Sequence, residues 1–335
     1  MAQDWIQRAA SFSGDRSDIP ADISPTKAHK RFQSLSFRRK NNVSPDYSRL
    51  STDSTLIGDF DVDMNYQSSD YFNNPFSSIA DYRKAAQQSE DPKFRFQYAQ
   101  YLINTAYRTR SKFFIDEARQ WLEILANPSL IQTKADSMKG EKVIGNGFDL
   151  AQYSLANWLM SGSYDIKVDE SKAFELYQMA SSQNHAPSWY LLAKCYQDGI
   201  GTEKNNEKAR EAYEKASLLG DSRASYVLGY AYIYGGIGIE SNPHLFLNGI
   251  ELLKACADNP QGDFYRDALY ELSILHSGSK KTKSLIKDPL YSLSCLTRAA
   301  NLGHDKSQFR LGYNYEFGLL ELPVDASRYF FISLI

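Results

Sequence analysis

Residues 186–220 read A-P-S-W-Y-L-L-A-K-C-Y-Q-D-G-I-G-T-E-K-N-N-E-K-A-R-E-A-Y-E-K-A-S-L-L-G, a pattern that predicts two short helices joined by a loop. Small and aromatic residues recur at helical spacing in both halves, as Tyr190 and Ala193 do in the first. Gly199 and Gly201 lie between the halves, where a tight helix reversal requires positive φ. A single hairpin of this kind cannot bury both of its faces, so the stretch predicts similar neighbours along the chain.

The pair Leu192-Ala193 recurs along the chain at a spacing of roughly 40 residues, and an aromatic residue stands two positions before each leucine. The pairs are Leu155-Ala156, Leu192-Ala193, Leu228-Gly229, Leu272-Ser273 and Leu311-Gly312, and their aromatic residues are Tyr153, Tyr190, Tyr226, Tyr270 and Phe309. A small residue that faces an aromatic ring lets two helices approach closely, as stacked hairpins require. We therefore predict an all-α fold, a right-handed α-solenoid of stacked helical hairpins.

Three regions are expected along the chain. Residues 1–78 are rich in Ser, Asp, Asn and Arg with few aliphatic side chains, and we expect a disordered tail. Residues 79–146 predict a divergent helical repeat followed by an insertion. Residues 147–335 predict five repeats, of which the last is incomplete.

Charge and cysteine content argue against several classes of protein. A net charge of −2 gives no indication of a nucleic-acid-binding protein. The cysteines, Cys195, Cys256 and Cys295, lie in helical patterns without CxxC spacing, which favours buried, reduced thiols. No apolar run reaches the ~18 residues of a membrane helix, and the first residues do not resemble a signal peptide. A cytoplasmic protein is expected.

The sequence predicts no catalytic residue, cofactor or metal site. The five histidines are scattered, and no HExxH, CxxC or His-x-His motif is present. Gly199-x-Gly201 and Gly236-x-Gly238 follow no predicted strand and recur at the repeat loop, so they do not indicate a nucleotide site. We therefore expect a protein that is not an enzyme and acts through its surface.

The concave groove of the solenoid is the expected protein-binding surface. On each first helix, the residue just past the small residue is predicted to face this groove, which suits an extended peptide or a partner helix. The alternative is that some of these residues pack against the next repeat. The candidates are Asn157, Lys194, Tyr230, Ile274 and Tyr313.

The segment Lys27–Lys40, K-A-H-K-R-F-Q-S-L-S-F-R-R-K, is a basic patch with three open interpretations. It is a solvated charge run, a kinase target that phosphate would partly neutralise, or a weak contact for an anionic membrane. Residues 51–74 are acidic and aromatic, and they suit a cover for the groove, a partner contact or a plain linker. The candidate phosphorylation sites are Ser24, Ser34, Ser36 and Ser44.

Several stretches carry a resemblance to known families. They are F-R-F-Q-Y-A-Q-Y-L-I at 94–103, D-E-A-R-Q-W-L-E-I-L-A at 116–126, A-Q-Y-S-L-A-N-W at 151–158, D-G-I-G at 198–201 and A-A-N-L-G-H-D-K-S-Q-F-R-L-G at 299–312. From about residue 94 onward the pattern resembles the SEL-one-like repeat, a tetratricopeptide relative with a longer, glycine-marked loop. The whole arrangement resembles the fungal chitin-synthase regulatory factor family.

This resemblance implies a non-catalytic adaptor that binds and localises or activates a cell-wall polysaccharide synthase, for chitin or glucan, at the division septum. The alternative is a generic cytosolic scaffold, for example in protein degradation or signalling. Several members of the family end in a prenylated cysteine box, but residues 332–335 contain no cysteine, so lipid anchoring is not expected to carry over. The apolar residues 330–335 favour a chain end that docks on itself or on a partner, or a longer natural architecture.

Overall fold

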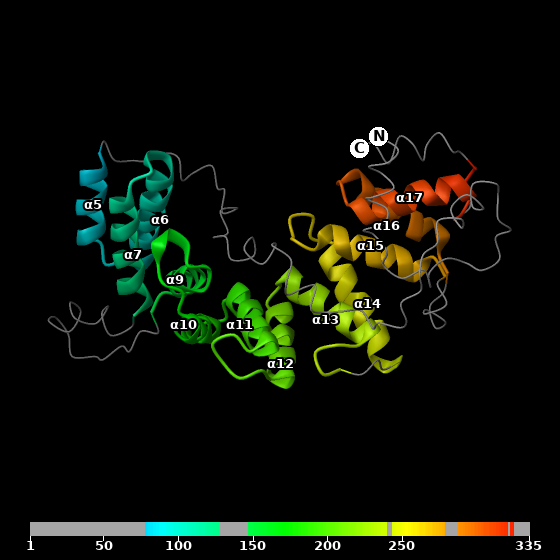
Figure 1. Cartoon of the computed structure of the whole chain (residues 1–335), viewed down its shortest axis with the longest axis horizontal. Helices are drawn as coiled ribbons and strands as arrows, with labels where there is room; N and C mark the ends of the chain where they lie inside the picture. Colours follow the sequence, from blue (N-terminus) through cyan, green and yellow to red (C-terminus); the bar gives the residue numbers. More distant parts are fainter. Residues whose placement is uncertain (1–77, 128–146, 240–242, 279–286, 321, 325–335) are drawn as a thin grey trace, which may run out of the picture. The chain divides into compact units, whose positions relative to one another are not determined.

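The computed structural model describes residues 78–127, 147–239, 243–278, 287–320 and 322–324. Residues 1–77 of the predicted tail, with its basic patch and its candidate phosphorylation sites, lie outside these residues. Within them the regular elements are helical, no strand is present, and one isolated β-bridge joins Gly236 and Ile239. The predicted all-α repeat fold is confirmed (Figure 1). The helices are α5 (Ile79–Gln88), α6 (Pro92–Thr109), α7 (Lys112–Ala126), α9 (Asp149–Ser161), η3 (Ser163–Asp165), α10 (Glu170–Ser182), α11 (Ala186–Asp198), α12 (Asn206–Leu218), α13 (Ser222–Tyr234), α14 (Pro243–Ala257), α15 (Tyr265–His276), α16 (Pro289–Asn301) and α17 (Asp305–Phe317).

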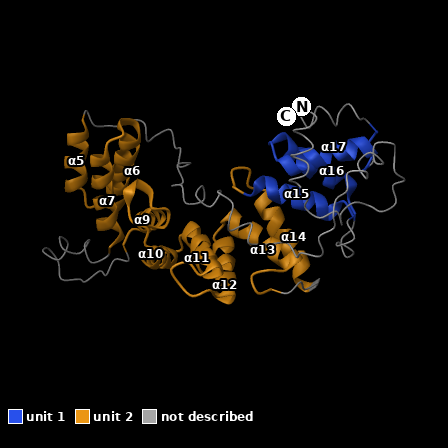
Figure 2. Cartoon of the chain, in the orientation of Figure 1, with its two compact units in different colours: residues 1–46, 264–335 blue, residues 47–263 orange. Residues whose placement is uncertain are grey.

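These helices fall into two compact units (Figure 2). Helices α5 to α14 belong to the larger unit, in which each helix packs against the next along the chain. Helices α15 to α17 belong to the smaller unit and enclose the side chains of Leu296, Ala300 and Leu311.

Equivalent positions in successive loops set the helix boundaries. The side chain of Asp169 accepts a hydrogen bond from the backbone N–H of Lys172 and so caps α10, and Asn205 caps α12 in the same way. The preceding helices α9 and α11 end at Gly162 and Gly199, which adopt the left-handed conformation that glycine accepts at low cost. The sequence pattern of the hairpin therefore fixes where its helices begin and end.

The larger unit is packed from the small and aromatic residues that define the repeat. Tyr177 and Tyr213 are fully enclosed among alanines such as Ala173 and Ala209. The aromatic column that precedes each leucine is buried at Tyr153 and Tyr190. Further along the chain the column becomes less buried: Tyr226 and Tyr270 are half-buried, and Phe309 is 42% exposed.

One loop glycine marks the closest approach between neighbouring hairpins. Gly201, in the α11–α12 loop, has φ of +65° and lies against the first turn of α10. A Cβ atom at this position would overlap the backbone carbonyl of Glu170 and would come within 3.0 Å of the Cβ of Phe174. The loop of one hairpin is thus seated directly on the second helix of the hairpin before it.

Helix α5 is held to α6 and α7 by a charged cluster. The Arg83 guanidinium donates two hydrogen bonds of 2.7 Å to the carboxylate of Glu117, one from Nε and one from Nη2. The Tyr98 hydroxyl donates a third, of 2.8 Å, to the same carboxylate. Burial, together with the hydrogen bond to Glu117, raises the pKa of Tyr98. The cluster joins side chains from three helices.

Arg83→Ala is expected to weaken the attachment of α5 by about 2 kcal/mol, because hydrogen bonds between charged groups contribute more than neutral ones. Hydrogen–deuterium exchange of the α5 amides measures this directly, and they should exchange faster while those of α11 are unchanged. Arg119→Ala is the control, since Arg119 pairs with Asp116 at a half-exposed site. Equal α5 exchange in the two variants would contradict the prediction.

Candidate functional site

The structure places the predicted groove residues in different environments. Asn157 is 0% exposed, and its Oδ1 accepts a 2.6 Å hydrogen bond from the Tyr177 hydroxyl. A partner at the surface cannot reach this side chain, so Asn157 belongs to the interior of the α9–α10 hairpin and not to a groove. The physical reason is that Tyr177 fills the space next to α9 and needs an acceptor for its buried hydroxyl.

Lys194 and Tyr230 are half-buried on α11 and α13. The Lys194 ammonium lies 5.8 Å from the centre of the Tyr190 ring. Tyr230 lies between two other tyrosines of α13, with ring centres 6.2 Å from Tyr226 and 4.6 Å from Tyr234. These side chains present aromatic and cationic surface, and their binding to a partner stays a prediction.

Ile274 and Tyr313 are half-buried in the smaller unit. The ring of Tyr313 lies 4.5 Å from that of Phe317, and burial raises the pKa of Tyr313. The five candidates are thus divided between the two units, and the binding of Ile274 and Tyr313 to a partner stays a prediction.

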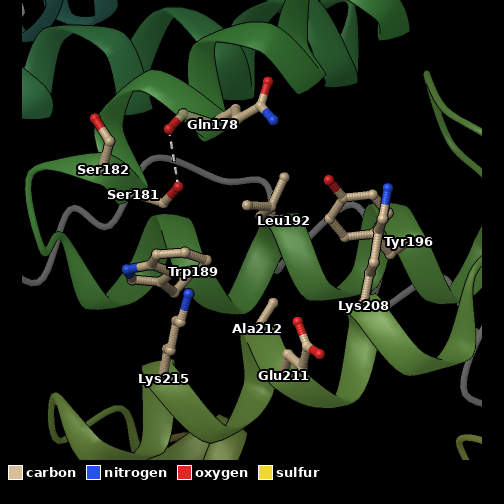
Figure 3. A pocket seen from close by; sticks show the side chains of 10 residues that line it. All are labelled: Gln178, Ser181, Ser182, Trp189, Leu192, Tyr196, Lys208, Glu211, Ala212 and Lys215. Carbon is tan, nitrogen blue, oxygen red and sulfur yellow. Dashed lines mark hydrogen bonds between the residues drawn. The ribbon is translucent and has the colours of Figure 1, made fainter.

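A pocket of about 320 Å³ lies between α10, α11 and α12, and we call it the α10–α12 groove (Figure 3). Three helices contribute to its walls, with α11 between the other two in sequence. Its lining residues are Gln178, Ser181, Ser182, Trp189, Leu192, Tyr196, Lys208, Glu211, Ala212 and Lys215.

Each end of this groove carries a lysine paired with an aromatic ring (Figure 3). The Lys215 ammonium lies 4.5 Å from the centre of the Trp189 ring, and the Lys208 ammonium lies 5.5 Å from that of Tyr196. These distances are within the range of cation–π attraction. The buried side chain of Leu192 lies on α11 between the two rings, so the middle of the groove has an apolar floor.

The groove carries one more positive charge than negative charge. Lys208 and Lys215 are both exposed, and neither forms an ion pair with another residue in the described part of the chain. Glu211, also exposed, is the acidic residue between them on α12. An anionic ligand would therefore find two ammonium groups already held in position by the aromatic rings.

Sequence reasoning did not predict the α10–α12 groove, although the chain contains a signal for it. Trp189 and Tyr196 are seven residues apart on one helix, and Lys208 and Lys215 are seven apart on the next. Seven residues correspond to about two helical turns, so each pair occupies one face. The signal is visible only when the two helices are considered together.

A buried ion pair at the start of α13 packs against Tyr190 of α11. Arg223 and Asp221 have side chains that are 10% and 5% exposed, and Arg223 Nη2 lies 2.7 Å from Asp221 Oδ2. The guanidinium also covers the Tyr190 ring at 4.5 Å. Burial acts against the charged form of Arg223, but the hydrogen bond and charge of Asp221 more than offset it and raise the pKa of Arg223.

Two histidines, each directly before the first helix of a hairpin, make the same contact with a serine. The Nδ1 atom of His185 lies 2.7 Å from Ser188 Oγ, and that of His304 lies 2.7 Å from Ser307 Oγ. Each ring also packs against the aromatic column, His185 against Tyr153 at 5.0 Å between ring centres. The sequence did not predict this role for the two histidines, because each imidazole both pairs with the serine hydroxyl three residues later and fills a packed site.

The stability of the larger unit is expected to fall as the pH drops below about 6.5, and His185 contributes to this fall. Burial, the main cause, lowers the pKa of His185 below its ordinary value of 6.5. Asp149 and Asp221 act in the opposite direction, and Arg223 acts with burial. The unfolded chain therefore takes up the proton first, and stability is lost through the window below 6.5.

Thermal unfolding between pH 7.5 and 5 measures this effect. His185→Asn should flatten the dependence, whereas His244→Asn is the matched control because His244 is exposed. A slope that is unchanged by His185→Asn would contradict the assignment.

The described residues contain neither a membrane-spanning helix nor a cluster of metal ligands. None of their helices combines the length and the apolar character needed to cross a bilayer. Histidine, cysteine and acidic side chains in this part of the chain nowhere gather in threes to hold a metal ion. Cys195, Cys256 and Cys295 are buried thiols, and burial is the main cause that raises the pKa of Cys195 to about 12.

Comparison with known protein families gives one clear match. The Sel1 repeat model matches five segments that together make up about half of the chain. They are residues 149–185, 188–221, 222–258, 266–304 and 305–328.

Known relatives share this region. Chitin synthase regulator SKT5 of Saccharomyces cerevisiae is 30% identical over 244 residues, which are 72% of this chain and 34% of that protein. Protein SHC1 of the same species is 26% identical over 238 residues, 69% of this chain and 45% of that protein. Chitin synthase regulatory factor 4 of Schizosaccharomyces pombe is 30% identical over 183 residues, 52% of this chain and 28% of that protein. The chain therefore spans less than half the length of these relatives.

Among solved structures, a Sel1 repeat protein from Oxalobacter formigenes superposes with a TM-score of 0.52 at 21% identity. The match covers 70% of this chain and 82% of that chain. It shows that the two proteins share a fold.

Proposed function

Because the chain belongs to the Sel1 repeat family, we propose that it is a non-catalytic regulator of a chitin synthase and acts by binding proteins through its helical surface. The observation that carries this proposal is the similarity to SKT5, a protein named as a chitin synthase regulator, over 72% of the chain. Similarity to regulatory factor 4 of a second yeast supports the same assignment.

The proposed mechanism is that of an adaptor. Stacked hairpins present long runs of side chains from successive repeats, which suits the binding of an extended segment of another protein. Half-buried aromatic and cationic residues such as Tyr230 and Lys194 have the composition that protein interfaces favour. In this proposal the chain binds a cytosolic segment of the synthase or of its recruiting complex.

Co-purification tests the partner. A tagged full chain, expressed in its own cells, is expected to recover chitin synthase activity from detergent-solubilised membranes, measured as incorporation of N-acetylglucosamine into insoluble polymer. A charge-reversed Lys194→Glu/Tyr230→Ala variant should recover less activity at equal protein yield. Recovery of the chain without chitin synthase activity, under conditions that recover activity with a tagged SKT5-like relative, would overturn the proposal.

The finer part of the proposal is recruitment to the division septum. A fluorescently tagged chain is expected to form a ring at the septum during division. The same chain without residues 1–78 tests whether the basic segment contributes to recruitment. An evenly cytosolic or reticular signal at every stage would overturn the septum assignment.

A further inference from the structure

The lining of the α10–α12 groove differs from the equivalent positions of the preceding repeat. In the preceding repeat, Gln152 and Leu159 occupy the positions of Trp189 and Tyr196, and Met179 occupies that of Lys215. That repeat forms its hairpin with neither ring and without the second lysine. Tyr196 also packs edge-on against Phe174 of α10, at 5.3 Å between ring centres. Trp189 and Lys215 are the additions that the preceding hairpin forms without, and they give this groove its second pair of cation and ring.

The spacing of the charges defines the shape of a ligand. Lys208 and Lys215 are two turns apart on α12, which places their backbone positions about 10 Å apart. An extended chain advances about 3.3 Å per residue and presents every second side chain on one face, so two carboxylates four residues apart, about 13 Å, face the groove together with the side chain midway between them. The flexible stems of the two lysines cover the few ångströms of difference. Between them, the floor of Leu192 and Ala212 favours an apolar side chain.

The balance of charge selects an acidic ligand. Two ammonium groups without an ion-pair partner among the described residues oppose the single carboxylate of Glu211. Aromatic contact holds both ammonium groups at the ends of the groove, and this lowers the entropy lost when a carboxylate binds. A basic segment would meet like charges at both ends.

We propose that the α10–α12 groove binds a short acidic segment of a partner protein, in extended form, with two carboxylates four residues apart and an apolar side chain midway between them. Lys208 and Lys215 pair with the carboxylates, and Trp189 and Tyr196 keep the two ammonium groups in place. The inference goes beyond the proposed function, because it holds for whichever protein carries the segment.

Selection from a phage library of eight-residue random peptides, with the full chain as bait, tests the proposal. The wild-type chain is expected to enrich peptides with acidic residues four apart and an apolar residue midway between them. An enriched peptide, labelled with fluorescein, should bind the Lys208→Glu/Lys215→Glu variant at least tenfold more weakly in fluorescence anisotropy. Lys172→Glu is the matched control, since Lys172 has the equivalent repeat position on α10 but does not line the groove, and its affinity should stay within twofold.

A charge-swapped peptide tests for a gain of binding, which a misfolded variant could not produce. The enriched peptide with lysines in place of its acidic residues should bind the double variant more tightly than it binds the wild-type chain. Enrichment of neutral or basic peptides, or equal affinity for wild type and double variant, would overturn the proposal. The proposal would also be overturned if the only defect of the double variant were weaker binding to phosphatidylserine vesicles or weaker self-association in sedimentation.

The peptide assay contains no synthase, so its failure is distinct from failure of the proposed regulatory function. If the groove binds acidic peptides but the chain recovers no chitin synthase, this inference holds and the proposed regulatory function is overturned.

Discussion

Arg223→Ala is expected to lower the free energy of unfolding of the larger unit by about 3–5 kcal/mol, the usual cost of removing one partner of a buried ion pair. Asp221 would keep its hydrogen bonds to the backbone N–H groups of Arg223 and Ala224, but its charge would lose the guanidinium that faces it. Tyr190 would also lose the cation that covers its ring at 4.5 Å. Urea denaturation followed by circular dichroism measures the change.

The matched control for this prediction is an exposed pair on the neighbouring helix. Arg210 and Glu214 are half-exposed and 3.7 Å apart, so Arg210→Ala is expected to cost less than about 1 kcal/mol. The double variant Asp221→Asn/Arg223→Met removes both charges and should recover part of the loss. Equal costs for Arg223→Ala and Arg210→Ala would contradict the assignment of a buried pair.

Gly201→Ala is expected to destabilise the larger unit by about 3 kcal/mol. An alanine at φ of +65° costs about 1 kcal/mol by itself, because its Cβ disfavours the left-handed conformation. The new methyl group would also overlap the backbone of Glu170, and relief requires a shift of the loop against α10, at about 1–3 kcal/mol. The same denaturation experiment measures the sum.

Gly220→Ala separates the two contributions. Gly220 also has positive φ, +92°, but a Cβ atom there would meet nothing within 4 Å. This variant should therefore show the conformational cost of about 1 kcal/mol and no more. If Gly201→Ala and Gly220→Ala cost the same, the loop of one hairpin is not seated on the helix of the previous one as described.

The repeat pattern was sufficient to predict the hairpins, because the small and aromatic residues that define it are the ones buried between the helices. Residues 186–220 form α11 and α12 with a glycine-bearing loop between them, as their spacing predicts. Buried Tyr213 and its alanine neighbours occupy the positions that the small and aromatic pattern assigns to the core. Helix packing of this kind depends on local spacing, which a single sequence displays directly.

The surface was harder to predict, because it depends on how two helices meet. Asn157 has the repeat position expected to face a groove, yet the hydroxyl of Tyr177, twenty residues later, takes its amide oxygen as an acceptor. The α10–α12 groove was missed for a related reason. Trp189 and Lys215 belong to different helices and come together only through the packing of α11 against α12.

The arrangement of hairpins also has a consequence for synthesis of the chain. Contacts that fix the larger unit join nearby residues, as Arg83 does with Glu117, 34 positions later, and Gln183 with Gln152, 31 positions earlier. A nascent chain therefore needs only one further hairpin outside the ribosome before the previous one can complete its core. Such local contacts favour rapid folding during translation, one hairpin after another, and shorten the time for which apolar helix faces are open to chaperones or aggregation.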